Sequence, residues 1–250
     1  MILSWRQTIP MSFTMAAMVV GFYSMLMSAA GEYVQAAQLI MVSMILDGLD
    51  GTLARALKGT TQVGAELDTF VDMTSFGLAP AILAYQAVLK DFGAWGFMLA
   101  SVIVLSGVYR LSRFRVVDPY RGQRGYLGLP ITTNAGWMAS FFIATECGRI
   151  EQEWFSLDHG AVAALFWSTT LVMLILQVSH VRYAKPTKNP IVFIPFSILM
   201  ILLFTKSDLA AAAALTLCAY GFWYAFIHPF FYRQHLLMEA EKEEVPVRHP

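Results

Sequence analysis

The chain has 250 residues, with 17 Lys and Arg against 17 Asp and Glu and a formal net charge of zero. Hydrophobic residues make up 57% of the chain and charged residues only 14%, which excludes an ordinary soluble domain and predicts a membrane protein with several spans. The absence of a basic surplus argues against nucleic acid as a partner and leaves membrane lipids as the expected surroundings. Cys147 and Cys218 lie in separate apolar segments, so neither a disulfide framework nor a zinc pair is expected.

Eight apolar stretches come close to the roughly 20 residues that a helix needs to cross a bilayer. They are residues 11–30, 34–57, 64–89, 94–114, 131–147, 160–180, 190–205 and 208–228. The expected fold is all-α, a polytopic bundle of about eight transmembrane helices within residues 1–232. Residues 233–250 lose the apolar character, so we expect a polar cytoplasmic tail. The first ten residues do not resemble a removable signal peptide.

The basic residues predict the orientation, because Lys and Arg collect in the cytoplasmic loops of membrane proteins. With the N-terminus inside, 14 of the 17 basic residues face the cytoplasm, and only Lys90, Arg149 and Lys206 face outward. We therefore expect both termini on the cytoplasmic side of an inner or cytoplasmic membrane.

One polar motif interrupts the apolar chain, in the order D-x2-D-G-x2-A-R-x8-G-x3-D-x3-D. Its positions are Asp47, Asp50, Gly51, Ala54, Arg55, Gly64, Asp68 and Asp72. A charged side chain at the centre of a membrane helix costs about 2.5–3.5 kcal/mol on insertion scales, so four acids indicate a site that offsets this cost. Spacings of three and four place the acids of each helix on one face. The short turn between the helices would bring both faces together near the cytoplasmic side.

Four carboxylates at close range repel one another, and hard oxygen ligands suit Mg²⁺ or Mn²⁺, with two ions expected. Two metals would clamp a pyrophosphate. Gly51 and Ala54 leave room for a bulky ligand, and Arg55 is a natural partner for a phosphate. Two other interpretations are helix packing through small residues and a cation transporter. Arg55 argues against the transporter, because it would repel a passing cation.

The motif matches at every position the signature of the CDP-alcohol phosphatidyltransferase family, which this chain resembles. Family members transfer a phosphatidyl group from CDP-diacylglycerol, or a related CDP-lipid, to an alcohol and release CMP. The resemblance implies that Asp47, Asp50 and Asp68 bind metal. Asp72 would help to bind it and act as the general base on the acceptor hydroxyl, where position matters more than basicity. The resemblance also implies which residues contact the CDP-lipid or leave room for it. They are Asp50, Gly51, Ala54, Arg55, Thr61 and Gly64.

Segments around the motif resemble the membrane-bound phosphatidylserine synthases of this family, the CDP-diacylglycerol–serine O-phosphatidyltransferases. They are residues 65–69, 72–80, 110–114, 128–130 and 178–183. The implied substrates are CDP-diacylglycerol and L-serine, and relatives suggest a homodimer. Choline, inositol phosphate and glycerol phosphate are the alternative acceptors. Such members often carry Asn at two positions of the first span where this chain has Met11 and Ala17.

Serine needs a cation near its carboxylate, and two pairs of residues are candidates for the acceptor site. Arg110 and Arg113 lie three residues apart at the cytoplasmic end of the fourth span. Their alternative role is ordinary anchoring at the membrane surface. Thr74 and Ser75 follow Asp72 and could bond the acceptor, or could bond back to the helix.

Overall fold

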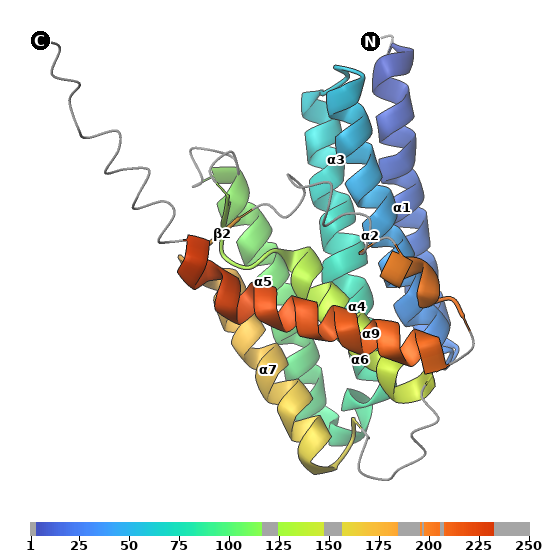
Figure 1. The fold of residues 1–250 in the computed structure, drawn as a ribbon, viewed down its shortest axis with the longest axis vertical. Coiled ribbons are helices and arrows are strands. Elements are labelled where there is room, and N and C mark those ends of the chain that lie inside the picture. Colours follow the sequence, from blue (N-terminus) through green and yellow to red (C-terminus); the bar gives the residue numbers. More distant parts are fainter. Residues whose placement is uncertain are drawn as a thin grey trace, which may run out of the picture.

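The computed structural model describes residues 4–116, 125–147, 157–184, 196, 198–205 and 208–232. Over these residues the chain is mostly helical (Figure 1), which confirms the predicted all-α class. Two short strands, β1 (Tyr126–Leu127) and β2 (Arg182–Tyr183), form an antiparallel pair.

Six helical segments are long and apolar enough to cross a membrane. They are α1 (Trp5–Ala29); α2 (Tyr33–Ala56); the run of α3 (Gln62–Asp72), the π-helical η1 (Met73–Leu78) and α4 (Ala79–Ala87); the run of η2 (Leu89–Phe92) and α5 (Gly93–Val116); α7 (Gly160–Val178); and the run of α9 (Asp208–Phe222) and the π-helical η4 (Trp223–Ile227), which continues to Tyr232. All six fall on predicted spans, so the chain is an integral membrane protein.

The other two predicted spans are supported less well. Residues 131–147 form α6 (Ile131–Cys147), which has 17 residues and whose described side chains are mostly buried. Residues 190–205 are described only at residue 196 and over residues 198–205. The predicted number of eight therefore exceeds the six that length and composition support among the described helices.

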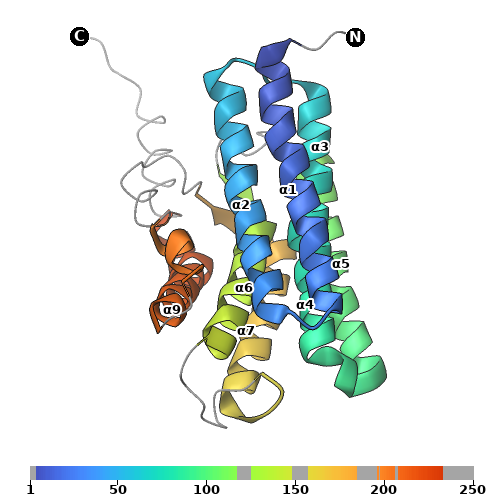
Figure 2. The same cartoon turned by 90° about the vertical axis from the view of Figure 1, so that its right-hand side faces the viewer.

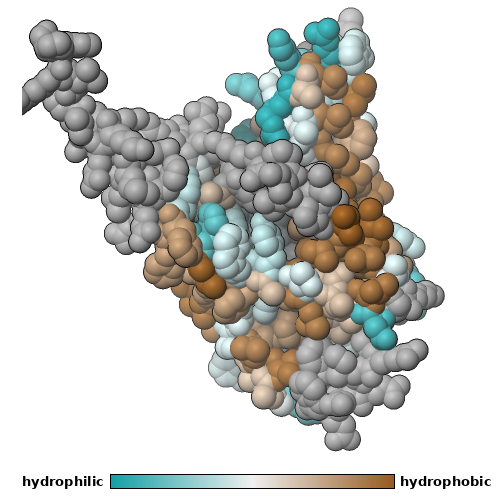
Figure 3. Space-filling model, in the orientation of Figure 1, coloured by the Kyte–Doolittle hydropathy of each residue, from teal (hydrophilic) through white to brown (hydrophobic). Residues whose placement is uncertain are grey.

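The helices α1 to α7 run along the length of the molecule, and α9 runs across them (Figures 1 and 2). The start of α1, the end of α2 and the start of α3 lie together at one end, the upper one in Figure 1. Hydrophilic side chains gather at that end in Figure 3, whereas hydrophobic ones cover the flank. The motif helices thus meet near the polar end of an apolar bundle.

Helix α1 holds the two motif helices side by side. Its buried residues are all small: Pro10, Thr14, Ala17, Gly21, Ser24 and Ser28. The carbonyl oxygen of Ala17 accepts hydrogen bonds from Ser43 on α2 at 2.9 Å and from Ser75 in η1 at 3.2 Å. A Cβ at Gly21 would lie 2.2 Å from Ser75 Oγ, so glycine permits this approach. Small residues at such spacing let helix backbones come close within a membrane.

Candidate active site

The turn between α2 and α3 reverses the chain within five residues, 57–61. Lys58 adopts a left-handed conformation with φ of 51°. A Cβ at Gly59 would lie 2.0 Å from the carbonyl oxygen of Arg6, so the turn packs closely against the start of α1. Thr61 then caps α3 by accepting a hydrogen bond of 2.9 Å from the Gly64 N–H. The two faces of the motif consequently lie opposite each other, as the sequence predicts.

Three of the four motif aspartates converge. Asp47, Asp50 and Asp68 each offer a carboxylate oxygen, and these oxygens all lie within 4.8 Å of one another. Asp50 is buried and Asp68 is exposed, so the group opens from the bundle toward its surface. Asp47 Oδ1 and Asp50 Oδ2 are buried without a hydrogen-bond partner. Unpaired carboxylate oxygens at this range fit a hard divalent cation, which would satisfy and neutralise them.

Asp72 adjoins this group, one helical turn beyond Asp68. It is half-buried, and both Asp68 and Arg110 act on it electrostatically. Asp72 is therefore close both to the converging carboxylates and to a cation from α5.

The predicted CDP-lipid residues line the outer end of α2. A Cβ at Gly51 would meet only the end of the Arg55 side chain, at 3.4 Å, so this face of the helix is open. Arg55 is exposed, donates to Thr52 Oγ1 at 3.3 Å and acts electrostatically on Asp50. Ala54 is half-buried. Thr61 and Gly64 lie across the turn and bond to each other, so the structure gives Thr61 a helix-capping contact.

On the opposite side, α5 contributes a buried guanidinium. Arg110 is 5% exposed, and its Nε has no hydrogen-bond partner. Its Cζ lies 6.0 Å from the centre of the Phe114 ring, which in turn lies 6.4 Å from the ring of Tyr126 on β1. A buried charge of this kind is costly unless an anion approaches it. Arg110 could therefore bind an anion beside Asp72.

Arg113, one turn along α5, has a different environment. Its guanidinium donates to the carbonyl oxygens of Val178 and Ser179, both at 2.6 Å, and of Leu127 at 3.3 Å. The Gly128 N–H donates to the Val181 carbonyl at 2.8 Å. Three segments that resemble the serine-using members of the family, residues 110–114, 128–130 and 178–183, therefore meet in one junction around Arg113.

The remaining predicted acceptor residues bond to the protein backbone. Thr74 donates to the carbonyl of Phe70 at 2.8 Å, within its own helix, and Ser75 donates to Ala17 on α1. Thr74 therefore makes the bond back to its own helix that was the alternative expectation, whereas Ser75 bonds to the neighbouring helix α1.

Tyr126 is the residue that sequence reasoning missed. Arg110, Asp72, Asp47 and Asp68 all act on it electrostatically, so Tyr126 lies in the neighbourhood of the aspartate group. Burial raises the pKa of Tyr126 above its ordinary value. The available signal was its position two residues before the segment 128–130, which stands out in the sequence.

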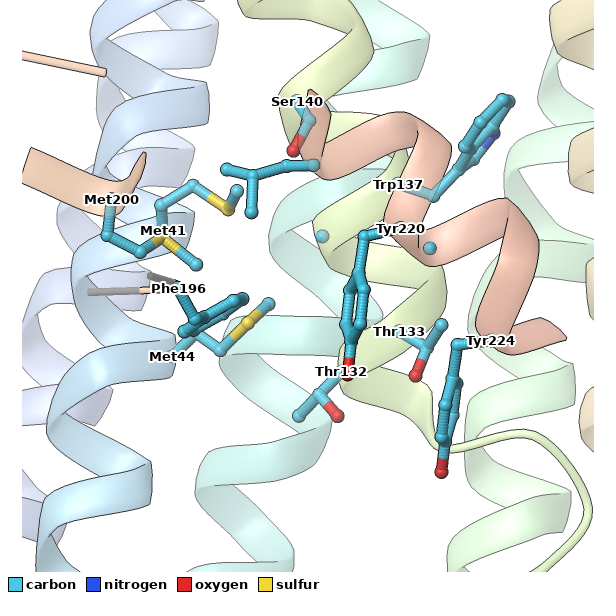
Figure 4. A pocket seen from close by; sticks show the side chains of 13 residues that line it. Met41, Met44, Thr132, Thr133, Trp137, Ser140, Phe196, Met200, Tyr220 and Tyr224 are labelled. Atoms are coloured by element: carbon cyan, nitrogen blue, oxygen red, sulfur yellow. The ribbon is translucent and has the colours of Figure 1, made fainter. Parts of the chain in front are cut away.

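Among the described residues, the structure has two cavities whose linings can be compared with the site. One of about 140 Å³ separates α2, α6 and α9 and is lined by apolar and aromatic side chains, among them Met41, Met44 and Tyr220 (Figure 4). Another of about 630 Å³ lies between β2, the end of α7 and η4. Neither is lined by a motif aspartate.

Comparison with known proteins places this arrangement in context. A family model described as CDP-alcohol phosphatidyltransferase matches residues 7–175. A CDP-diacylglycerol–serine O-phosphatidyltransferase of Helicobacter pylori is 31% identical over 200 residues, which cover 79% of this chain and 81% of the relative. An archaetidylserine synthase of Methanothermobacter thermautotrophicus is 37% identical over 126 residues, covering 49% of this chain and 52% of the relative. The Bacillus subtilis CDP-diacylglycerol–serine O-phosphatidyltransferase is 36% identical over 92 residues, covering 37% and 51%.

Proposed function

This chain belongs to the CDP-alcohol phosphatidyltransferase family, and from that premise we propose that it transfers the phosphatidyl group of CDP-diacylglycerol to the hydroxyl of L-serine. The products are phosphatidylserine and CMP. The observation that carries the proposal is the convergence of Asp47, Asp50 and Asp68 at the end of an apolar bundle. The names of relatives that align over most of this chain support serine as the acceptor.

In the proposed reaction, the serine hydroxyl oxygen attacks the phosphorus that carries the diacylglycerol. A new oxygen–phosphorus bond forms, and the bond from that phosphorus to the bridging oxygen of CMP breaks. Asp72 takes the hydroxyl proton, and CMP leaves with the bridging oxygen. A carboxylate is a weak base for an alcohol, so Asp72 acts through its position beside the acceptor. Direct attack fits the described part of the site, in which no side chain stands out as a covalent nucleophile.

The proposed metal ligands are Asp47, Asp50 and Asp68, with help from Asp72, for Mg²⁺ or Mn²⁺ and for two ions. When bound, the ions supply positive charge that stabilises the pyrophosphate and the charge developing on it. Two buried, unpaired carboxylate oxygens support this assignment. Arg55 supplies a further positive charge on the side of Asp50, and Gly51, Ala54 and Gly64 leave the CDP-lipid room to approach.

Arg110 is the residue we propose for the serine carboxylate. It is buried, its Nε is unpaired, and it acts electrostatically on Asp72. A carboxylate bound there would lie near the proposed base. The side chains of Arg113, Thr74 and Ser75 donate to backbone carbonyl oxygens. In the proposal, these three residues therefore support the acceptor site and do not contact the acceptor themselves.

The proposed topology has eight spans within residues 1–232, both termini in the cytoplasm and the active site at the cytoplasmic face of the cytoplasmic membrane. The concentration of Lys and Arg in alternate loops supports it, whereas the direction of α9 across the bundle stands against a simple eighth span. Single cysteines placed at Lys58 and Asp91 should react with an impermeant thiol reagent from opposite sides. The proposed tail, residues 233–250, lies outside the described residues. A homodimer stays a prediction, to be tested by mass measurement in detergent.

The function is tested with purified protein in detergent, given CDP-diacylglycerol, Mg²⁺ or Mn²⁺ and one alcohol at a time. CMP release should require serine. Release with choline, inositol phosphate or glycerol phosphate instead would overturn the acceptor assignment and leave the family intact. A protein that releases no CMP with any alcohol, but carries divalent cations across vesicles, would support the transporter interpretation.

A further inference from the structure

The larger cavity, of about 630 Å³, takes no part in the proposed reaction. It lies between β2, the end of α7 and the helical run that ends at Tyr232, and no motif aspartate lines it. Binding sites for small ligands have volumes of about 300–1,000 Å³. The cavity is therefore large enough to hold part of an amphipathic molecule.

Much of the lining is apolar. It includes Leu176 at the end of α7, and Phe226 and Phe230 on the last helical run. The Phe230 side chain is 75% exposed, so this wall continues to the surface of the molecule. Both helical segments are long and apolar enough to cross a membrane. Covering such a wall with a hydrocarbon chain is favourable, because it removes apolar surface from water.

Strand β2 adds a cation to this lining. Arg182 is half-buried and lines the cavity together with His180. The Arg182 guanidinium has no hydrogen bond or ion pair to any described residue. None of the described residues that line the cavity is acidic, so nothing in that lining neutralises its charge. A guanidinium matches the geometry of a phosphate and can donate two parallel hydrogen bonds to it.

The wall that carries Arg182 is held by contacts on both sides. Arg182 pairs with Leu127 across the β1–β2 ladder. The next residue, Tyr183, is fully buried, and its hydroxyl donates to the Ala225 carbonyl in η4 at 3.0 Å. This bond ties η4 to β2, which lie side by side in Figure 1. The position of the Arg182 backbone is therefore set before any ligand binds.

We propose that this cavity binds an anionic phospholipid, with the lipid phosphate beside Arg182 and an acyl chain along Leu176, Phe226 and Phe230. Basic pockets between membrane helices bind anionic head groups on the cytoplasmic side. A lipid fits better than a free phosphate, because only a lipid also covers the apolar wall. The inference goes beyond the proposed function, since it involves neither the aspartate group nor the acceptor alcohol. Only the leaflet that supplies the lipid depends on the proposed orientation.

The test measures lipid binding to the purified protein in detergent by native mass spectrometry. Phosphatidylglycerol should bind more tightly than phosphatidylcholine, whose head group carries a compensating cation. Losing a hydrogen bond to a charged group lowers affinity by about 10- to 100-fold. Arg182→Gln should weaken phosphatidylglycerol binding by that factor, and Arg182→Lys should weaken it less. Arg6→Gln, which alters an exposed arginine at the start of α1, should match wild type.

A second variant tests the apolar wall without disturbing the core. Phe230→Ala removes a mostly exposed ring. It should weaken binding of phosphatidylglycerol by about 3- to 10-fold, because the ring is only partly covered by the lipid. Its melting temperature without added lipid should match that of wild type. This variant keeps the proposal falsifiable if Arg182→Gln fails to fold.

Several results would overturn the proposal. Equal binding of the two lipids, or wild-type affinity in Arg182→Gln or Phe230→Ala, would exclude this cavity as a site for anionic lipid. Glycerol 3-phosphate that binds as tightly as phosphatidylglycerol would identify a site for free phosphate. Binding that is lost in Arg55→Gln but kept in Arg182→Gln would place the lipid at the proposed CDP-lipid site. The proposed function fails on a different observation, the absence of serine-dependent CMP release.

Discussion

Replacing Gly128 by alanine should damage both the stability and the acceptor site. The residue has φ of +78°, and a left-handed conformation costs a residue with a Cβ about 1–2 kcal/mol. The new Cβ would also lie 2.3 Å from the carbonyl oxygen of Gln177 and 2.7 Å from Arg113 Nη2. Relieving such overpacking costs about 1–3 kcal/mol. Together these effects lower the free energy of unfolding by about 2–5 kcal/mol.

Gly31→Ala is the matched control, because Gly31 has φ of +87° and nothing within 4 Å of its hypothetical Cβ. It should lose only the conformational part, about 1–2 kcal/mol. Unfolding of both purified variants in the same detergent measures the difference, and serine kinetics report on the junction. Gly128→Ala should raise KM for serine more than KM for CDP-diacylglycerol. A Gly128→Ala protein as stable as Gly31→Ala would refute the reasoning about the close contact.

Asp72→Asn should lower kcat by about 10²–10⁴-fold, the usual contribution of a general base, while equilibrium binding of CDP-diacylglycerol persists; unchanged turnover would exclude the base role. Chelation with EDTA should abolish CMP release and added Mg²⁺ or Mn²⁺ should restore it, and Asp50→Asn should raise the metal concentration needed for half-maximal activity. Activity that persists after exhaustive chelation would contradict the metal assignment. Thr61→Ala removes the α3 cap and should lower the free energy of unfolding by about 1 kcal/mol, whereas Thr61→Ser keeps a capping hydroxyl; equal stability of the two variants would contradict the capping role.

Helical periodicity and charge were sufficient to predict much of the motif's geometry. A spacing of three placed Asp47 and Asp50 on one face of α2, a spacing of four placed Asp68 and Asp72 on one face of the next helix, and the short turn allowed only an antiparallel return. Hydrophobic length likewise located the helices, since membrane spans must cover a fixed thickness. These features depend on residues near one another in the sequence, which is why the sequence alone predicts them.

Contacts between distant segments were beyond such reasoning. The sequence predicted that Arg110 and Arg113 lie together at the end of α5. Only the tertiary structure distinguishes their environments: Arg110 is close to Asp72, whereas Arg113 donates to backbone carbonyl oxygens. Strands of two residues give no periodic signal, so the pairing of Tyr126 with Tyr183 could not be predicted. The direction of α9 could not be predicted either, because the length and composition of an apolar helix do not depend on its orientation in the bundle.

The small buried face of α1 has a consequence for the accuracy of the site. Neighbouring helices touch this face through backbone atoms and short hydroxyls, with Ala17 and Gly21 at the closest approaches. Short groups have few rotamers, so thermal motion of side chains has little means of widening the gap between α2 and η1. The spacing of the carboxylates thereby depends on close backbone contacts, and it should persist when the surrounding lipid changes in thickness or fluidity.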